Sequence, residues 1–203
     1  MQKILVFGGT FNPIHLGHIR LYSHFAKLLK VDKTLIIPDN IPPHKEAKEL
    51  VSGNDRLEMC RLAVQNDPTA EVSNMELLRE GESYTDITLK LLKNEYKGAQ
   101  LYFVIGSDMF FTLDKWKNPQ IIISLATICT AARHPNELIA LNEKAGELKA
   151  VFGGEYIIEN EKVLEISSTQ LRQMIRENKS TRKYLHPAVA EYIKMNGLYR
   201  NEI

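Results

Sequence analysis

Short apolar runs alternate with segments of helical periodicity along the chain, and this alternation constrains the fold more than any other feature. The apolar runs predict strands at 3–7, 34–38, 71–74, 101–105 and 127–132, with a weaker strand or hairpin at 156–166. The periodic segments predict helices at 16–30, 54–65, 137–148, 168–177 and 187–195, and a helix that begins near 83–85. Strands that alternate with helices form a mostly parallel α/β sheet. We therefore expect an α/β, Rossmann-like, doubly wound sheet with helices on both faces.

Residues 39–52 are too polar and too rich in proline for regular structure, and they predict a long exposed loop. No repeat, low-complexity tract or linker divides the chain. The length of 203 residues is ample for one hydrophobic core. We expect a single domain over 1–203, with the helical segment from about 168 to 203 packed on it.

The charge balance argues against two classes of partner. Lys plus Arg number 26 and Asp plus Glu number 25, so no global field attracts nucleic acid or an anionic membrane. No apolar run reaches the roughly 18 to 20 residues of a membrane span, and the N-terminus lacks a signal-peptide pattern. Cys60 and Cys129 lack the spacing of metal ligands or redox pairs, which suits a reducing compartment. We expect a cytoplasmic protein.

The segment GGTFNPIHLGH, residues 8–18, follows the first predicted strand directly. In an open parallel sheet the ligand crevice lies beyond the carboxyl ends of the strands. Gly8 and Gly9 allow the backbone to turn tightly and to approach an anion closely, and the N-terminus of the next helix favours a phosphate. His15 and His18 are three residues apart on the first helical turn, with Gly17 leaving room between them. Such a pair can donate hydrogen bonds to two phosphate oxygens.

Two other interpretations of this segment remain open from the residues alone. The histidines can simply cap and pack the start of the helix. They can also ligate a metal with His24, although His24 lies nine residues from His15 and no carboxylate is adjacent. The segment matches neither the GxGxxG dinucleotide fingerprint nor the P-loop.

The eleven residues Gly8 to His18 resemble the signature of the HxGH nucleotidyltransferases, and in particular of the bacterial nicotinate-nucleotide adenylyltransferases. Asn12 stands where the commoner members have Asp. The resemblance implies the HxGH nucleotidyltransferase fold, with His15 and His18 as catalytic residues. It also implies that Gly8, Gly9, Thr10 and Phe11 bind ATP.

A second block, Ile166 to Arg172, resembles the ISSTxxR segment of the same family. Ser167, Ser168 and Thr169 supply hydroxyls and amides at a helix start, and Arg172 follows Ser168 by one turn. This arrangement can hold triphosphate oxygens, while a serine-capped helix with an exposed arginine is the plain alternative. The resemblance implies that these four residues bind ATP.

Three further segments resemble the substrate-binding parts of the family. In the PPHK loop, Asn40, His44 and Lys45 are implied to bind a mononucleotide. In the SYTDIT segment Thr85 is implied to lie near the pyridine ring. In the GSD segment and the stretch after it, Gly106 and Asp108 are implied at the adenosine, Asp108 also at the mononucleotide, and Trp116 against the ring. The family also has an arginine at the position of Arg133, near the nucleotide.

The resemblance implies transfer of the adenylyl group of ATP to nicotinate mononucleotide, with pyrophosphate released. Mg²⁺ is expected to arrive with ATP, because no carboxylate cage for a metal is visible in the sequence. The alternatives are transfer to nicotinamide mononucleotide or to phosphopantetheine, and a noncatalytic nucleotide-binding protein. The expected partners are the two nucleotides, without nucleic acid or membrane, and the sequence is compatible with a homo-oligomer.

Overall fold

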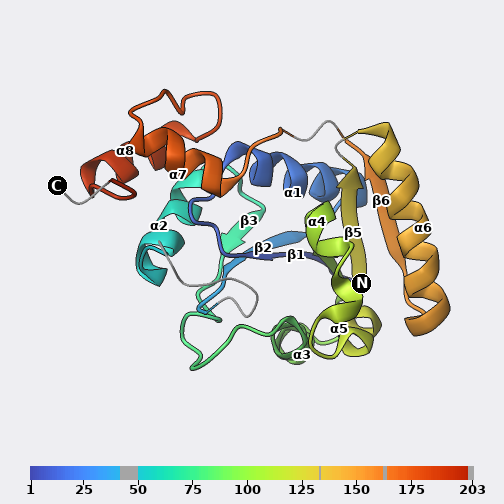
Figure 1. Cartoon of the computed structure of the whole chain (residues 1–203). Coiled ribbons are helices and arrows are strands. Elements are labelled where there is room, and N and C mark those ends of the chain that lie inside the picture. Colours follow the sequence, from blue (N-terminus) through green and yellow to red (C-terminus); the bar gives the residue numbers. More distant parts are fainter. Residues whose placement is uncertain (42–49, 133, 162–163, 201–203) are drawn as a thin grey trace.

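The computed structural model of the protein describes residues 1–41, 50–132, 134–161 and 164–200. Its centre is a six-stranded sheet in the order β3-β2-β1-β4-β5-β6, and every neighbouring pair is parallel (Figure 1). The strands are β1 (Lys3–Gly9), β2 (Lys33–Pro38), β3 (Ala70–Val72), β4 (Gln100–Val104), β5 (Thr127–Ala132) and β6 (Tyr156–Asn160). The expected α/β, doubly wound fold is confirmed.

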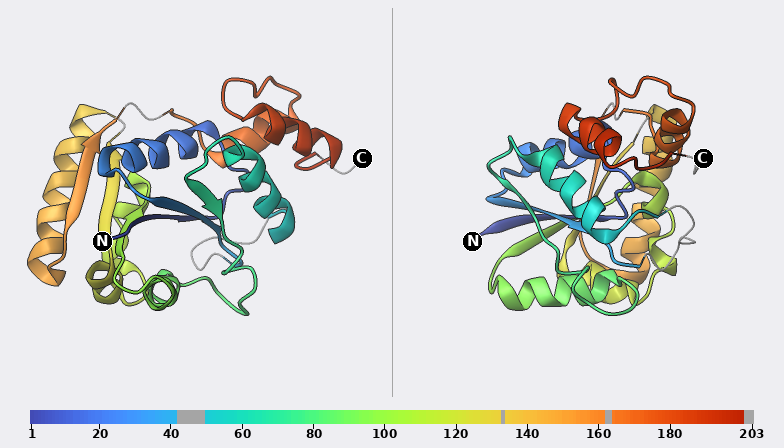
Figure 2. Two further views of the ribbon diagram at one scale, coloured as in Figure 1. Left: turned by 180° about the vertical axis from the view of Figure 1, so that it is seen from behind. Right: turned by 90° about the vertical axis from the view of Figure 1, so that its left-hand side faces the viewer.

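Helices cover both faces of the sheet (Figure 2). Two hydrophobic clusters fill the space between the helices and the sheet. Successive β1 residues alternate between the clusters, Leu5 in one and Ile4 in the other, because strand side chains point to opposite faces. The first cluster contains residues of α1 (Leu16–Leu29), α2 (Gly53–Val64), α7 (Ser168–Arg176) and α8 (Pro187–Met195). The second contains residues of α3 (Thr85–Glu95), α4 (Ser107–Phe110), α5 (Pro119–Leu125) and α6 (Pro135–Phe152).

Several element boundaries differ from those predicted. The strand expected at 3–7 continues through the glycines, since Gly8 and Gly9 pair with Ile37 and Pro38 of β2. The helix expected at 137–148 runs over Pro135–Phe152, because the His134 side chain accepts a hydrogen bond from the backbone of Glu137 and caps it. The strand expected at 156–166 ends at Asn160.

Three short elements between β4 and β5 were not predicted: α4, α5 and the 3-10 helix η1 (Leu113–Lys115). Elements of this length contain two turns at most, so apolar periodicity does not reveal them. Pro119 at the first position of α5 was the available signal. Most of the loop expected at 39–52 lies outside the described residues.

β1 pairs with both β2 and β4. On one side of the β1–β4 pair the chain adds β2 and β3 outward, and on the other side it adds β5 and β6 outward. From β1 the chain continues into α1 on one face, and from β4 it continues into α4 on the other. A crevice opens beyond the carboxyl ends of the strands at such a switch point. Among the residues that the structure describes, no helix combines the length and the apolar character needed to cross a membrane.

Candidate active site

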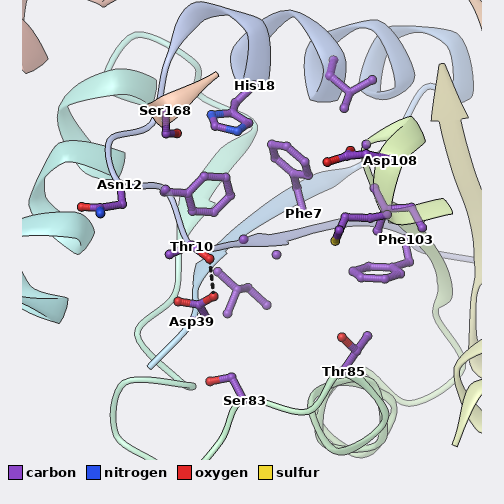
Figure 3. Close-up of a pocket in the computed structure, with 18 of the residues that line it drawn as sticks. Phe7, Thr10, Asn12, His18, Asp39, Ser83, Thr85, Phe103, Asp108 and Ser168 are labelled. Carbon is purple, nitrogen blue, oxygen red and sulfur yellow. Dashed lines mark hydrogen bonds between the residues drawn. The ribbon is translucent and has the colours of Figure 1, made fainter. Parts of the chain in front are cut away.

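A cavity of about 530 Å³ lies at this switch point and collects segments from the whole chain (Figure 3). Most of the described residues that the sequence predicted for the site line it together: Gly8, Gly9, Thr10, Phe11, His15, His18, Thr85, Gly106, Asp108, Trp116, Ser167, Ser168, Thr169 and Arg172. We call the side formed by Thr10, His15, His18, Ser168 and Arg172 the histidine wall. The side formed by Tyr84, Thr85, Trp116 and Lys117 is the tryptophan wall.

The two histidines stack on each other at the start of α1, with ring centroids 3.6 Å apart and an interplanar angle of 18°. Each ring also caps the helix. Nδ1 of His15 accepts the backbone N–H of His18 at 3.3 Å, and Nδ1 of His18 accepts the backbone N–H of His15 at 3.2 Å. A neutral imidazole whose Nδ1 accepts a hydrogen bond carries its proton on Nε2. This capping therefore makes Nε2–H the donor of each ring.

Gly17 between the histidines has a steric reason. A Cβ at this position would lie 3.0 Å from Nδ1 of His15 and 3.1 Å from the Leu164 carbonyl oxygen. A larger residue would therefore disturb the stacked pair. The room that the sequence predicted at Gly17 is confirmed.

The tight turn was expected at Gly8 and Gly9, but it lies two residues later. Phe11 adopts a left-handed conformation with φ of 45°, which is uncommon for a residue with a side chain. Its ring is 3% exposed and packs edge-on against Phe7, with centroids 5.4 Å apart. The Phe11 ring also meets the His18 ring at 5.2 Å and 86°. Packing of this aromatic side chain holds the turn.

The second motif joins the first through hydrogen bonds between α7 and the turn. Oγ of Ser168 donates to the Pro13 carbonyl oxygen at 2.9 Å, and Arg172 donates to the Asn12 carbonyl oxygen at 2.9 Å. The side chain of Asn12 accepts the hydroxyl of Tyr199 at 2.8 Å, near the other end of the chain. Asn12 thus takes part in supporting the turn.

A buried arginine supports the same turn and was not predicted. Arg56 is 1% exposed and donates to the Asp39 carboxylate and to the Thr10 carbonyl, both at 2.9 Å. The hydroxyl of Thr10 in turn donates to Asp39 at 2.8 Å (Figure 3). Arg56 precedes the buried Met59 and Cys60 by three and four residues, so it lies on the buried face of α2. That position was the sequence signal for a buried charge.

Two ring contacts contribute to the tryptophan wall. Trp116 meets Phe103 of β4 edge-on, with centroids 6.3 Å apart and an interplanar angle of 73°. Nζ of Lys117 lies 3.6 Å from the ring centroid of Tyr84. Thr85 begins α3, across the cavity from His18 and Ser168 (Figure 3). Lys117 was not among the residues predicted for the site.

A carboxyl group lies buried beside this wall. Glu76 lines the cavity and is 7% exposed, and burial raises the pKa of its carboxyl despite the hydrogen bond that Thr88 donates. Arg79 lies 4.0 Å from the same carboxylate. The raised pKa reflects desolvation, which outweighs the nearby arginine and hydroxyl groups.

One predicted site residue is described but does not line the cavity, and three others lie outside the described residues. The Asn40 side chain donates to the Arg79 carbonyl oxygen at 3.0 Å and is not among the described residues that line the cavity. His44, Lys45 and Arg133 lie outside the described residues. Their roles stay predictions.

The residues around the cavity suit a divalent ion only if the ligand brings most of the oxygens. Within the described ranges no group of three or more His, Cys, Asp or Glu side chains is arranged to hold a metal. The Asp39 carboxylate on the cavity wall is already paired with Arg56. An ion held by substrate phosphates and water agrees with this donor set.

The fold and the cavity define an α/β protein that binds an anionic nucleotide at a sheet switch point. The cytidylyltransferase-like family model matches residues 6–174. A protein of Caldicellulosiruptor saccharolyticus is 35% identical over 199 residues, covering 98% of this chain and 100% of its own. One of Borrelia garinii subsp. bavariensis is 35% identical over 202 residues, covering 100% and 97%. Both are named "Probable nicotinate-nucleotide adenylyltransferase". The chain belongs to the cytidylyltransferase-like family and, within it, to the nicotinate-nucleotide adenylyltransferases.

Solved structures resemble the fold over its full length. The nicotinic acid mononucleotide adenylyltransferase of Plasmodium falciparum complexed with NaAD superposes with a TM-score of 0.79 at 19% identity, covering 98% of both chains. The same enzyme complexed with APC gives 0.77 at 18% identity, again covering 98% of both chains. The overall arrangement of elements is therefore that of this enzyme class.

Proposed function

We propose that the protein transfers the adenylyl group of ATP to nicotinate mononucleotide, giving nicotinate adenine dinucleotide and pyrophosphate. The observation that carries this proposal is the histidine wall. Two motifs about 150 residues apart in the sequence line one cavity, joined by the hydrogen bond from Ser168 to Pro13. The names of the relatives and of the solved structures support the same reaction.

In the reaction a phosphate oxygen of the mononucleotide attacks the α-phosphorus of ATP. A bond from this oxygen to phosphorus forms while the bond from the α-phosphorus to the bridging oxygen of pyrophosphate breaks. The attacking phosphate is largely ionised at neutral pH, since the second pKa of a phosphate monoester is about 6. No general base is required. The protein has to align two anions and supply positive potential where charge develops.

The histidine pair meets this requirement. Because the backbone occupies Nδ1 of both rings, Nε2–H of His18 donates to the α-phosphate and Nε2–H of His15 donates near the α–β bridge. A donor fixed in place by the fold stabilises developing charge without reorganising during the reaction. Capping and catalysis are thus two functions of the same rings.

Two further residues of the histidine wall, Ser168 and Arg172, hold the leaving pyrophosphate together with Thr169. Ser168, Thr169 and Arg172 lie at the start of α7, where hydroxyls, amides and a guanidinium favour phosphate oxygens. Gly8, Gly9, Thr10, Phe11 and Ser167 complete the ATP site, with Gly106, Asp108 and Arg133 toward the adenosine. Mg²⁺ arrives as part of the ATP substrate.

On the other side of the cavity, the pyridine ring stacks on Trp116, whose polar neighbours leave an aromatic face for a flat ring. Thr85 and Asp108 contact the mononucleotide from α3 and α4, together with Asn40, His44 and Lys45. We place the activity in the cytoplasm, which the free and buried thiols of Cys60 and Cys129 support.

Pyrophosphate release measured in parallel with three acceptors tests the function. We expect the highest kcat/KM with nicotinate mononucleotide, a lower value with nicotinamide mononucleotide, and no turnover with phosphopantetheine. With ATP labelled at the α-phosphorus, the label should appear in the dinucleotide. Binding of ATP without turnover of any acceptor would identify a noncatalytic nucleotide-binding protein and contradict the proposal.

A further inference from the structure

The cavity carries cationic side chains on two opposite walls. Arg172 projects from α7 on one face of the sheet and donates to the Asn12 carbonyl oxygen and to Thr169. Lys117 lies between η1 and α5, next to Trp116 on the other face. Among the described residues that line the cavity, these two are the only lysine or arginine. Each wall therefore presents its own positive charge.

The ammonium group of Lys117 rests on an aromatic face. Its Nζ lies 3.6 Å from the centroid of Tyr84, a distance typical of a cation–π contact. Within the described part of the chain no carboxylate pairs with Lys117. The ring keeps the ammonium at the cavity wall without neutralising its charge, so an anionic ligand group can still bind it.

Tyr84, Thr85, Trp116 and Lys117 all line the cavity, and the contact of Lys117 with Tyr84 brings these two pairs of chain neighbours together. If the pyridine ring stacks on Trp116, as in the proposed function, its ring substituent lies beside this group of residues. Nicotinate carries a negative carboxylate as this substituent, and nicotinamide carries a neutral amide. A cation at this position distinguishes the two by charge, because only the carboxylate gains a charge-assisted contact.

We propose that Lys117, held over the Tyr84 ring, binds the ring carboxylate and gives the enzyme its preference for nicotinate over nicotinamide mononucleotide. This inference rests on the proposed function. Lys117 acts here as a specificity-determining residue and takes no part in the transfer itself. The side chain is exposed, so solvent weakens the contact and the effect is moderate.

The test compares kcat/KM for the two mononucleotides in the wild-type protein and in Lys117→Met. We expect the value for nicotinate mononucleotide to fall about five- to tenfold through KM, and the value for nicotinamide mononucleotide to change less than about twofold. Lys117→Arg should keep the preference. Added salt should raise the KM for nicotinate mononucleotide more in the wild type than in Lys117→Met, because salt screens an exposed ionic contact.

Lys115→Met is the matched control, because Lys115 is also exposed, lies two residues away and does not line the cavity. Lys115→Met should leave kcat/KM for both mononucleotides unchanged. An equal loss for both mononucleotides in Lys117→Met would place the ammonium on a phosphate and overturn the inference, as would an unchanged ratio. A wild-type protein that turns over neither mononucleotide would instead overturn the proposed function, and this inference with it.

Discussion

The two walls of the cavity are built in different ways. On the histidine wall four side chains that we assign to the phosphates are also fixed by a bond to the backbone: the histidine rings to N–H groups, Ser168 and Arg172 to carbonyl oxygens. On the tryptophan wall, ring contacts join Trp116 to Phe103 and Lys117 to Tyr84. Groups that stabilise developing charge must be rigid, whereas a flat ring needs only a face.

The largest expected effect concerns the support behind the histidine wall. Arg56→Met leaves the Asp39 carboxylate without its buried partner, and we expect the free energy of unfolding to fall by about 3 to 5 kcal/mol. Urea denaturation measures this loss. Arg61→Met is the control, because Arg61 is 55% exposed on the same helix and its removal should cost less than about 0.5 kcal/mol. Equal losses in the two variants would show that the Arg56 network does not support this wall.

His18→Ala should lower kcat by about two to three orders of magnitude, equivalent to roughly 3 to 4 kcal/mol, since it removes a donor to the α-phosphate. It also removes a helix cap, which costs about 1 kcal/mol of stability. His18→Glu separates the two effects, because a glutamate at this position can still accept the N–H of residue 15 but has no donor for the phosphate. We expect His18→Glu to be stable and inactive. Near-normal kcat in either folded variant would contradict the assignment.

On the tryptophan wall we expect a smaller effect, confined to binding. Trp116→Ala should raise the KM for the mononucleotide by about tenfold, a loss of roughly 1 to 3 kcal/mol of stacking, while kcat changes little. Trp116→Phe keeps an aromatic face and should recover most of the affinity. If Trp116→Ala changes only the KM for ATP, the assignment of the tryptophan wall to the mononucleotide and of the histidine wall to ATP is wrong.

The smallest expected effect is at the far end of the chain. Tyr199→Phe removes the hydrogen bond to Asn12 and should cost about 1 kcal/mol of stability. Tyr192→Phe is the control, since its bond to Asp55 is more exposed to solvent. If Tyr192→Phe lowers the free energy of unfolding as much as Tyr199→Phe does, burial of the hydrogen bond to Asn12 adds nothing to stability.

Burial also raises the pKa of the Tyr199 hydroxyl in the folded protein. The unfolded chain therefore loses this proton first, at a pKa of about 10, and wild-type stability declines as the pH rises above that value. In Tyr199→Phe this part of the decline should disappear. Unfolding curves between pH 8 and pH 11, roughly spanning the unfolded tyrosine pKa, measure it. Identical pH profiles for the variant and the wild type would contradict the assigned burial.

The same contrast explains which parts of the site could be predicted from the sequence. The histidine wall uses backbone geometry at helix starts, which requires particular residues at fixed spacing, so residues 8–18 and 166–172 were recognisable as motifs. Arg56 and Lys117 were missed because each acts through a contact between distant segments. Arg56 reaches Asp39, and Lys117 reaches Tyr84, across more than 15 and 30 residues of chain respectively.

The fold could be predicted from the apolar pattern of the strands. The errors of this prediction lie where the apolar pattern is short or interrupted. The short helices α4 and α5 contain too few residues for a period to appear. The cap at His134 extended α6 beyond its apolar stripe, because histidine is not among the usual capping residues. Capping of the first helix and binding of phosphate are not exclusive alternatives for His15 and His18. Capping uses Nδ1 of each ring, and we assign phosphate binding to Nε2–H.

The claim that residues 8–18 and 166–172 hold one triphosphate can be tested by a crystal structure of the protein with a nonhydrolysable ATP analogue. Such a structure locates both motifs relative to the same triphosphate. We predict that Nε2 of His18 lies about 3 Å from an oxygen of the α-phosphate. We also predict that Ser168 and Arg172 contact the β- and γ-phosphates of the same molecule. A triphosphate held by only one of the two motifs, with the other turned toward solvent or another ligand, would contradict this claim.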